Sequence, residues 1–228
     1  NCTDVASLSA PTLLEPTNES SLKTLIPLYK WDIAAEMNLT GMNLSFDVAT
    51  DPDFTEYVTG LIYPYDGRDS TVGNFRLPSN LEASTTYYWR AWLSCEETDG
   101  PFSDTFSFTT GSNGTILPAP LLIAPANGSQ VPANQVLGQW SAVEEGVEYL
   151  LFWRESGTNA TTYRWVNGTE SILEYSFKVG TTYDWWVSAR NEYAIGTDSD
   201  SWQFTTSLAI TPTNTATLTP TASHTATL

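Results

Sequence analysis

The segment TTYDWWVSAR at residues 181–190 decides the fold, because a related segment, TTYYWRAWLS, lies at residues 85–94. In the later copy Tyr183, Trp185 and Val187 occupy alternate positions, and the earlier copy has the same alternation of aromatic and apolar residues. A period of two is typical of a β-strand that buries one face. The chain therefore contains a duplicated β unit.

Further matches extend the duplication in both directions. The segment FSDTFSFTT at 102–110 matches DSDSWQFTT at 198–206, with the same offset of 96 residues as the first pair. Toward the N-terminus the offset is 109, over the pairs Pro11/Pro120, Leu13/Leu122, Pro16/Pro125, Asn18/Asn127, Ser20/Ser129 and Trp31/Trp140. The second unit therefore lacks about thirteen residues between its Trp140 strand and its TTY strand.

Short segments of alternating polarity lie between these landmarks and are separated by Gly, Pro, Asn and Asp. This pattern predicts an all-β chain of two tandem antiparallel β-sandwiches, with no helix beyond one turn at 80–84. We expect a leader at 1–10, a first domain at 11–111, a second domain at 117–206 and an extended tail at 207–228. The additional strands are expected at 44–50, 57–63, 71–77, 147–154, 161–166 and 171–177.

The two units resemble tandem fibronectin type III domains of secreted bacterial or archaeal surface proteins. The resemblance rests on a strand that ends in Trp, a T-T-Y-x-W strand, a closing strand that ends in F-x-T-T or Q-F-T-T, and the segment FDVATDPDF at 46–54. It implies that Tyr87 and Tyr183 are tyrosine corners, whose hydroxyl groups bond back to the backbone before the strand. It specifies the fold but not the function, because this sandwich serves many roles.

The charge of the chain limits its partners. A formal net charge of −17 and a pI near 4.1 disfavour nucleic acid and anionic membranes. The sequence has no apolar run long enough for a transmembrane helix. It begins at Asn1 rather than Met, and we expect a mature secreted protein whose signal peptide has been removed. The alternative is a chain expressed without its natural start.

Two features of the sequence support an extracellular location. The only two cysteines, Cys2 and Cys95, are expected to form one disulfide, with two free thiols as the alternative. N-glycosylation sequons are more frequent than chance predicts, although Asn-Gly-Ser/Thr is also common in turns. The eight candidate sites are Asn1, Asn18, Asn38, Asn43, Asn113, Asn127, Asn159 and Asn167.

The sequence contains no set of residues that resembles a catalytic or cofactor site. Its single histidine, His224, lies in the tail, so no Ser–His–Asp triad or histidine metal site is expected within the domains. The acidic pairs at 96–97 and 144–145 are interpreted as solvated surface. The Asp residues at 66–69 and 198–200 offer calcium only a weak site, because no twelve-residue loop pattern is present. We expect no enzyme activity, and no cofactor apart from covalent glycans.

The second domain has more large apolar residues than one core needs. When Tyr183 and Trp185 face inward, Trp186 faces outward, and the segment 147–154 is apolar on both faces. We expect an outer patch, since the third and sixth strands of this sandwich are neighbours. Its candidate members are Leu150, Phe152, Tyr163, Trp165 and Trp186. Candidate covers are a neighbouring subunit, the tail of another copy, the other domain, a sugar, or a loop or glycan of the same domain.

The tail at 207–228 has no acidic or basic residue other than His224. Its alternating pattern and two prolines favour an extended or polyproline conformation. Two interpretations stay open: a flexible, O-glycosylated stalk, or a segment that lies against a partner. The O-glycosylation candidates are Thr211, Thr213, Thr215, Thr217, Thr219, Thr221, Ser223, Thr225 and Thr227.

These features favour a non-enzymatic, glycosylated, extracellular structural protein. We expect a subunit of a surface filament, stalk or layer that contacts copies of itself through its tail and its second domain. The alternative is an adhesion or carbohydrate-binding domain pair from a larger cell-surface protein, in which the aromatic patch stacks on a sugar.

Overall fold

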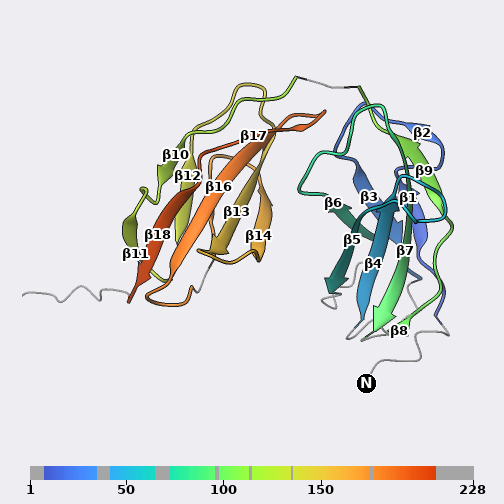
Figure 1. Ribbon diagram of the computed structural model, residues 1–228, viewed down its shortest axis with the longest axis horizontal. Helices are drawn as coiled ribbons and strands as arrows, with labels where there is room; N and C mark the ends of the chain where they lie inside the picture. Colours follow the sequence, from blue (N-terminus) through green and yellow to red (C-terminus); the bar gives the residue numbers. More distant parts are fainter. Residues whose placement is uncertain are drawn as a thin grey trace, which may run out of the picture.

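The structure is a computed structural model that describes residues 8–34, 42–64, 72–95, 98–112, 115–134, 136–174 and 177–208. Within these residues the chain forms eighteen strands and no helix. The strands build two β-sandwiches, which lie side by side and are joined at one end (Figure 1). The two tandem sandwiches predicted from the duplication are thus confirmed.

The first domain packs a three-stranded sheet, in the order β1-β3-β6, against a larger sheet in the order β2-β9-β7-β4-β5. The strand β8 pairs with β7 at the edge of the larger sheet. The bounds are β1 Thr12–Glu15, β2 Ser20–Ser21, β3 Leu28–Asp32, β4 Asn43–Ala49, β5 Tyr57–Pro64, β6 Val72–Arg76, β7 Thr86–Cys95, β8 Thr98–Asp99 and β9 Phe106–Thr109.

The second domain repeats this topology. Its small sheet has the order β10-β12-β15, and its large sheet has the order β11-β18-β16-β13-β14, with β17 paired to β16. The bounds are β10 Leu122–Ala124, β11 Ser129–Pro132, β12 Leu137–Trp140, β13 Glu148–Glu155, β14 Thr161–Val166, β15 Glu170–Ile172, β16 Thr182–Arg190, β17 Ile195–Asp198 and β18 Trp202–Ser207.

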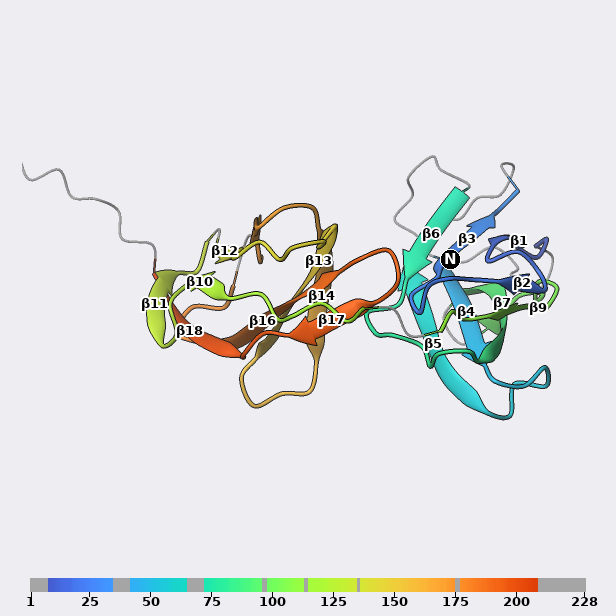
Figure 2. The same cartoon turned by 90° about the horizontal axis from the view of Figure 1, so that it is seen from above.

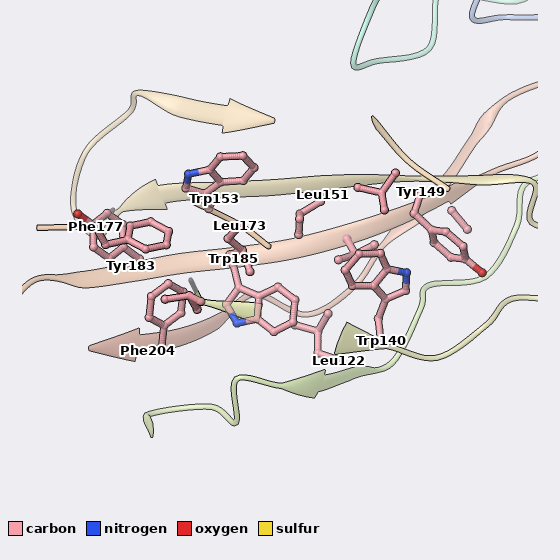
Figure 3. Close-up of a cluster of buried hydrophobic side chains, with 14 of the residues drawn as sticks. Leu122, Trp140, Tyr149, Leu151, Trp153, Leu173, Phe177, Tyr183, Trp185 and Phe204 are labelled. Atoms are coloured by element: carbon pink, nitrogen blue, oxygen red, sulfur yellow. The ribbon is translucent and has the colours of Figure 1, made fainter. Parts of the chain in front are cut away.

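The alternating residues that identified the duplication form the two cores. In the second domain Tyr183, Trp185 and Val187 of β16 belong to one buried cluster with Trp140 of β12 and Trp153 of β13. Figure 3 shows Tyr183 beside Phe177 at one end of this core and Trp140 beside Tyr149 at the other. Trp185 is fully buried. Each core buries its aromatic residues between two sheets, and this burial is the main favourable contribution to folding.

The closing strand of each domain is interrupted, which the sequence prediction missed. Ser103 and Ser199 are 96 residues apart, and each lies between two short strands. The Ser103 backbone N–H donates to the Ala91 carbonyl at 2.8 Å, and its side-chain Oγ accepts from the Ala91 N–H at 3.0 Å. Ser199 forms the same two bonds with Val187, at 2.9 and 3.0 Å. A serine hydroxyl thus replaces one main-chain acceptor in each ladder.

The predicted strand at 171–177 is shorter than expected, because only Glu170–Ile172 pairs as β15. After Leu173 the chain leaves the sheet and returns Phe177 to the core, where the Phe177 N–H donates to the Ala133 carbonyl at 2.9 Å. Leu173 and Phe177 are therefore buried without strand pairing.

The residues missing from the second domain fall at two places. Val48 pairs with Trp89 across β4 and β7, and Trp153 pairs with Trp185 across β13 and β16. The offset is therefore 109 at Trp31, 105 at Val48 and 96 at Trp89. Four residues are absent between β12 and β13, and nine are absent between β13 and β16.

Candidate functional site at the domain junction

The hairpin between β16 and β17 reaches from the second domain to the first (Figures 1 and 2). The Tyr193 carbonyl accepts hydrogen bonds from the Leu25 N–H at 2.7 Å and from Thr24 Oγ1 at 3.0 Å. The Asn80 carboxamide binds both main-chain groups of Ile195: Nδ2 donates to the carbonyl at 2.8 Å, and Oδ1 accepts from the N–H at 2.8 Å. Four direct hydrogen bonds between described residues therefore join the two domains.

An apolar contact lies beside these bonds. Ile26 of the first domain packs against Leu150 of β13 and Ile195 of β17, and all three side chains are buried. Leu150 points away from the core of its own domain, and the first domain covers it. The first domain therefore covers the part of the predicted outer patch that contains Leu150.

Charged side chains surround this apolar contact. Glu148 Oε2 lies 2.6 Å from Arg190 Nη2 within the second domain and 3.7 Å from Arg76 Nη1 of the first domain. Both guanidinium groups also lie over the Trp165 ring, with their carbon atoms 5.8 Å (Arg76) and 5.6 Å (Arg190) from its centroid. Burial lowers the pKa of Arg76, and Arg190 adds to this, while Glu148 opposes it. One carboxylate thus holds two cations at the junction.

The chain that connects the two domains, which includes Thr115, is held to the same hairpin by Asn191. Asn191 is a buried residue that follows β16. Asn191 Oδ1 accepts from the N–H groups of Tyr193 and Ala194, both at 2.9 Å, which shapes the turn. Its Nδ2 donates to the Thr115 carbonyl of the linker, also at 2.9 Å. The turn motif Asn-Glu-Tyr is a sequence signal that was available for this residue, whereas the sequence offers no signal for Asn80.

A cleft of about 430 Å³ opens at the junction between the two domains. Ile26 and Arg76 line it from the first domain, and Arg190 and Glu192 line it from the second. Glu15 contributes a further carboxylate. Both signs of charge are therefore present in the cleft, so it does not favour an anion or a cation.

Three of the predicted patch residues form a row across the outer face of the second domain. Phe152 of β13 pairs with Tyr163 of β14 on one side and with Trp186 of β16 on the other. The Phe152 and Trp186 rings stack with their centroids 5.1 Å apart and their planes at 11°. The Tyr163 ring lies 6.2 Å from Phe152. All three are partly exposed, and we call them the aromatic row.

The first domain has a different pair at the equivalent positions. Asp47 pairs with Arg90 across β4 and β7, and Arg90 Nη2 lies 3.0 Å from Asp47 Oδ2. The Arg90 guanidinium lies between two rings, 4.1 Å from the Phe54 centroid and 4.3 Å from the Phe102 centroid. The duplication therefore places an ion pair in one domain where the other has an aromatic stack.

Tyrosine hydroxyl groups close a turn in both domains. Tyr87 accepts a hydrogen bond from the Glu82 N–H at 3.0 Å, and Tyr183 accepts one from the Lys178 N–H at 3.3 Å. Each donor lies five residues before its tyrosine. Tyr149 forms a third bond of this kind, which was not predicted, by accepting from the Val143 N–H at 3.0 Å.

The sheet orders, the duplicated tyrosine turns and the Greek-key-like return of the closing strands settle the architecture. Both domains are fibronectin type III-like sandwiches. No protein-family model matches the sequence, and no curated protein matches it. Among solved structures, the chain is similar to the FN1-FN3 domains of chicken CNTN1, with 15% identity and a TM-score of 0.38 over 88% of this chain and 68% of that one. The assignment rests on the strand order.

A hydrogen-bonded carboxylate lies beside the aromatic row of the second fibronectin type III-like domain. Arg154 Nε donates to Asp184 Oδ2 at 3.1 Å, and the Arg154 guanidinium lies 5.4 Å from the Trp186 centroid. Burial raises the pKa of Asp184, but hydrogen bonds from Gln203, Ser156 and Arg154 outweigh burial and bring the pKa below its usual range. This charged group bounds the aromatic row on the side of the β13–β14 turn.

The described sequons lie on the surface, with one exception. Asn159 and Asn167 are exposed in turns, whereas Asn43 is partly buried at the start of β4. Asn18 and Asn127 are exposed, and their Oδ1 atoms accept from the N–H groups of the closing strands, at 2.8 Å from Ser107 and 2.9 Å from Gln203. These bonds leave Nδ2, the atom that carries a glycan, available. Asn1, Asn38, Asn113 and all O-glycosylation candidates lie outside the described residues.

Cys95 is buried at the end of β7 and is not a free thiol. Cys2 lies outside the described residues, so the Cys2–Cys95 bridge stays a prediction. The weak calcium candidates at 66–69 also lie outside them. Among the described residues no group of three or more His, Cys, Asp or Glu side chains is arranged to hold a metal ion. None of the described segments is a helix long and apolar enough to cross a membrane.

Proposed function

We propose that the chain is a non-enzymatic structural segment of an extracellular surface protein, in which the two domains act as one stiff unit. The observation that carries this proposal is the set of four hydrogen bonds between the domains, formed by Thr24, Leu25 and Asn80 with the β16–β17 hairpin. The buried contact between Ile26 and Leu150 adds apolar area to them. Relative motion is the default for neighbouring domains unless contacts between them fix their orientation.

Small-angle X-ray scattering of the whole chain tests this stiffness. A stiff pair gives a single narrow distribution of interatomic distances that matches the junction described above. A mobile pair gives a broad distribution that requires many relative orientations, and this result would refute the proposal.

The same proposal includes N-glycosylation of an exposed surface. It is supported by the exposure of Asn18, Asn127, Asn159 and Asn167. The measurement is the intact mass of native material before and after enzymatic removal of N-glycans. A native mass equal to the 25.1 kDa polypeptide would contradict glycosylation.

The proposal also includes assembly, with the tail at 207–228 joining copies of the chain into a filament, stalk or layer. Support comes from composition, because the tail contains no acidic residue, whereas the rest of the chain carries the net charge of −17. A chain truncated after Leu208 keeps every residue of β18. Electron micrographs of the truncated and full chains test this part, and unchanged assembly after truncation would exclude the tail as the connector.

A second candidate function is adhesion through carbohydrate. The near-parallel stack of Phe152 and Trp186 favours it, because flat, partly exposed rings suit stacking against a sugar face. Glycan-array binding that is lost on Trp186→Ala would support it. Trp165 is a poorer probe than expected, because Arg76 and Arg190 enclose it at the junction.

A further inference from the structure

The junction leaves part of the outer apolar face of the second domain without a cover. The first domain covers Leu150, and the aromatic row continues from that contact along β13, since Phe152 packs against the same cluster. Phe152, Tyr163 and Trp186 remain partly exposed. Contiguous apolar area that continues an established interface marks a further contact site.

The surroundings of the aromatic row select the kind of partner. The Arg154–Asp184 pair closes one end of the row and already satisfies its own charges. Neither an acidic nor a basic segment would find an unpaired counter-charge there, and an acidic segment would also be repelled by a chain whose net charge is −17. An uncharged segment that offers apolar rings or methyl groups avoids both costs.

We propose that the aromatic row binds the Thr/Pro-rich tail of a second copy of this chain. Twenty residues follow Leu208 in the sequence, and they include Pro212 and Pro220 and no acidic or basic residue other than His224. Pro-containing extended segments dock on aromatic surfaces because they lose little conformational entropy on binding. At about 3.1 Å per residue such a segment spans about 60 Å, enough to reach a neighbouring molecule.

The direction of β18 favours a second copy over the same chain. Trp202 pairs with Trp185, and Thr205 pairs with Thr182, so β18 runs away from the level of Trp186. The described chain ends at Leu208, which is 74% exposed. To reach its own row, the tail would have to reverse immediately and run back about 20 Å. This proposal rests on the tail-mediated assembly described under Proposed function and names the surface that receives the tail.

The test uses the duplication itself to design the variant. The double substitution Phe152→Asp and Trp186→Arg gives the second domain the ion pair that Asp47 and Arg90 form in the first. Circular dichroism checks that this variant folds, and Trp186→Ala replaces it should it fail. The matched control is Leu121→Asp with Ile123→Arg, which changes two apolar residues that are 72% and 57% exposed elsewhere on the same domain.

Analytical ultracentrifugation then measures self-association over a range of concentrations. We expect the full chain and the control to associate, and both the row variant and the chain truncated after Leu208 to associate at least tenfold more weakly. A mixture of the row variant, which keeps its tail, and the truncated chain, which keeps its row, is expected to form a one-to-one complex.

Each other outcome overturns the proposal in a distinct way. Association that is lost on truncation but unaffected by the row variant would mean that the tail binds elsewhere, and tail-mediated assembly would survive. A full chain that stays monomeric while its tail protects Phe152 and Trp186 from hydrogen exchange or quenching would place the tail on its own copy. A monomeric chain with an unprotected row would exclude both the row as a tail site and assembly through the tail.

Discussion

Phe152 and Trp186 stack across β13 and β16 at the positions where Asp47 and Arg90 form an ion pair across β4 and β7. The same two backbone sites thus carry a charged pair in one domain and an aromatic pair in the other. A cross-strand pair of either kind stabilises a sheet by a similar small amount. The difference between the domains therefore concerns the surface that each presents more than its stability.

The Asn80 carboxamide is expected to limit the motion of the two domains relative to each other. Asn80→Ala removes both bonds to Ile195, which together contribute roughly 1 to 3 kcal/mol. We expect faster hydrogen exchange at Ile195 and a broader distance distribution in X-ray scattering. Asn74→Ala is the control, because Asn74 is exposed on β6 of the same domain. Equal behaviour of the two variants would contradict this role.

Asn191 is expected to matter more for stability than its place in a turn suggests. Asn191→Ala removes three hydrogen bonds in a buried site and leaves their partners unpaired, so it should cost about 2 to 4 kcal/mol. Chemical denaturation of the full chain measures the loss. Asn159→Ala in the exposed β13–β14 turn is the comparison and should change stability by less than about 0.5 kcal/mol. A similarly small loss for Asn191→Ala would disprove the assignment.

Removal of the Glu148 carboxylate should destabilise the junction, because this carboxylate neutralises Arg76 and Arg190. Glu148→Gln leaves Arg76 and Arg190 facing each other over Trp165 without a counter-charge. We expect a loss of about 2 to 4 kcal/mol in thermal unfolding, since these groups are mostly buried. Glu15→Gln, which breaks an exposed pair with Lys30, should cost less than about 1 kcal/mol. Addition of salt should partly rescue the Glu148 variant, and no rescue would argue against charge repulsion as the cause.

The strands could be predicted from the sequence because alternation reports which face of a strand is buried. The same alternation identified Trp186 as outward-facing and grouped it with Phe152. The surface of the first domain that meets the second could not be predicted, because the residue types of Leu25 and Ile26 do not report which domain they face and Asn80 has no distinguishing context. The repeated Ser103 and Ser199 were visible as a match, but their bonds to the neighbouring strand depend on a geometry that residue type does not report.

Acid should weaken the second domain partly through Asp184. Its pKa is lower in the folded state than the unfolded value of about 3.9. The stabilisation is therefore fully present above about pH 5 and is lost as the pH falls through the folded pKa. Denaturation at a series of pH values tests this, and Asp184→Asn should flatten the curve below pH 4. An unchanged acid limb in the variant would show that Asp184 does not contribute.

The predicted disulfide between Cys2 and Cys95 should be visible in native material. Without reductant we expect no thiol that reacts with an alkylating reagent, and with reductant we expect two. A bridge that closes a loop of this length stabilises a domain by about 2 to 5 kcal/mol. Reduction should therefore lower the melting temperature of the first domain and leave that of the second in place. Two reactive thiols in native, unreduced protein would rule the bridge out.

The hairpin forms its hydrogen bonds to the first domain through its main chain, since Tyr193 and Ile195 offer carbonyl and N–H groups to Thr24, Leu25 and Asn80. These bonds depend on the shape of the hairpin, which Asn191 sets, more than on the side chain at Tyr193. Substitutions at Tyr193 leave its carbonyl in place, whereas insertion of a single residue into the hairpin would shift the Tyr193 and Ile195 carbonyls and the Ile195 N–H out of reach. The length of the hairpin thus sets the angle between the two domains. A change in that length is the simplest way to give the chain a different interdomain angle.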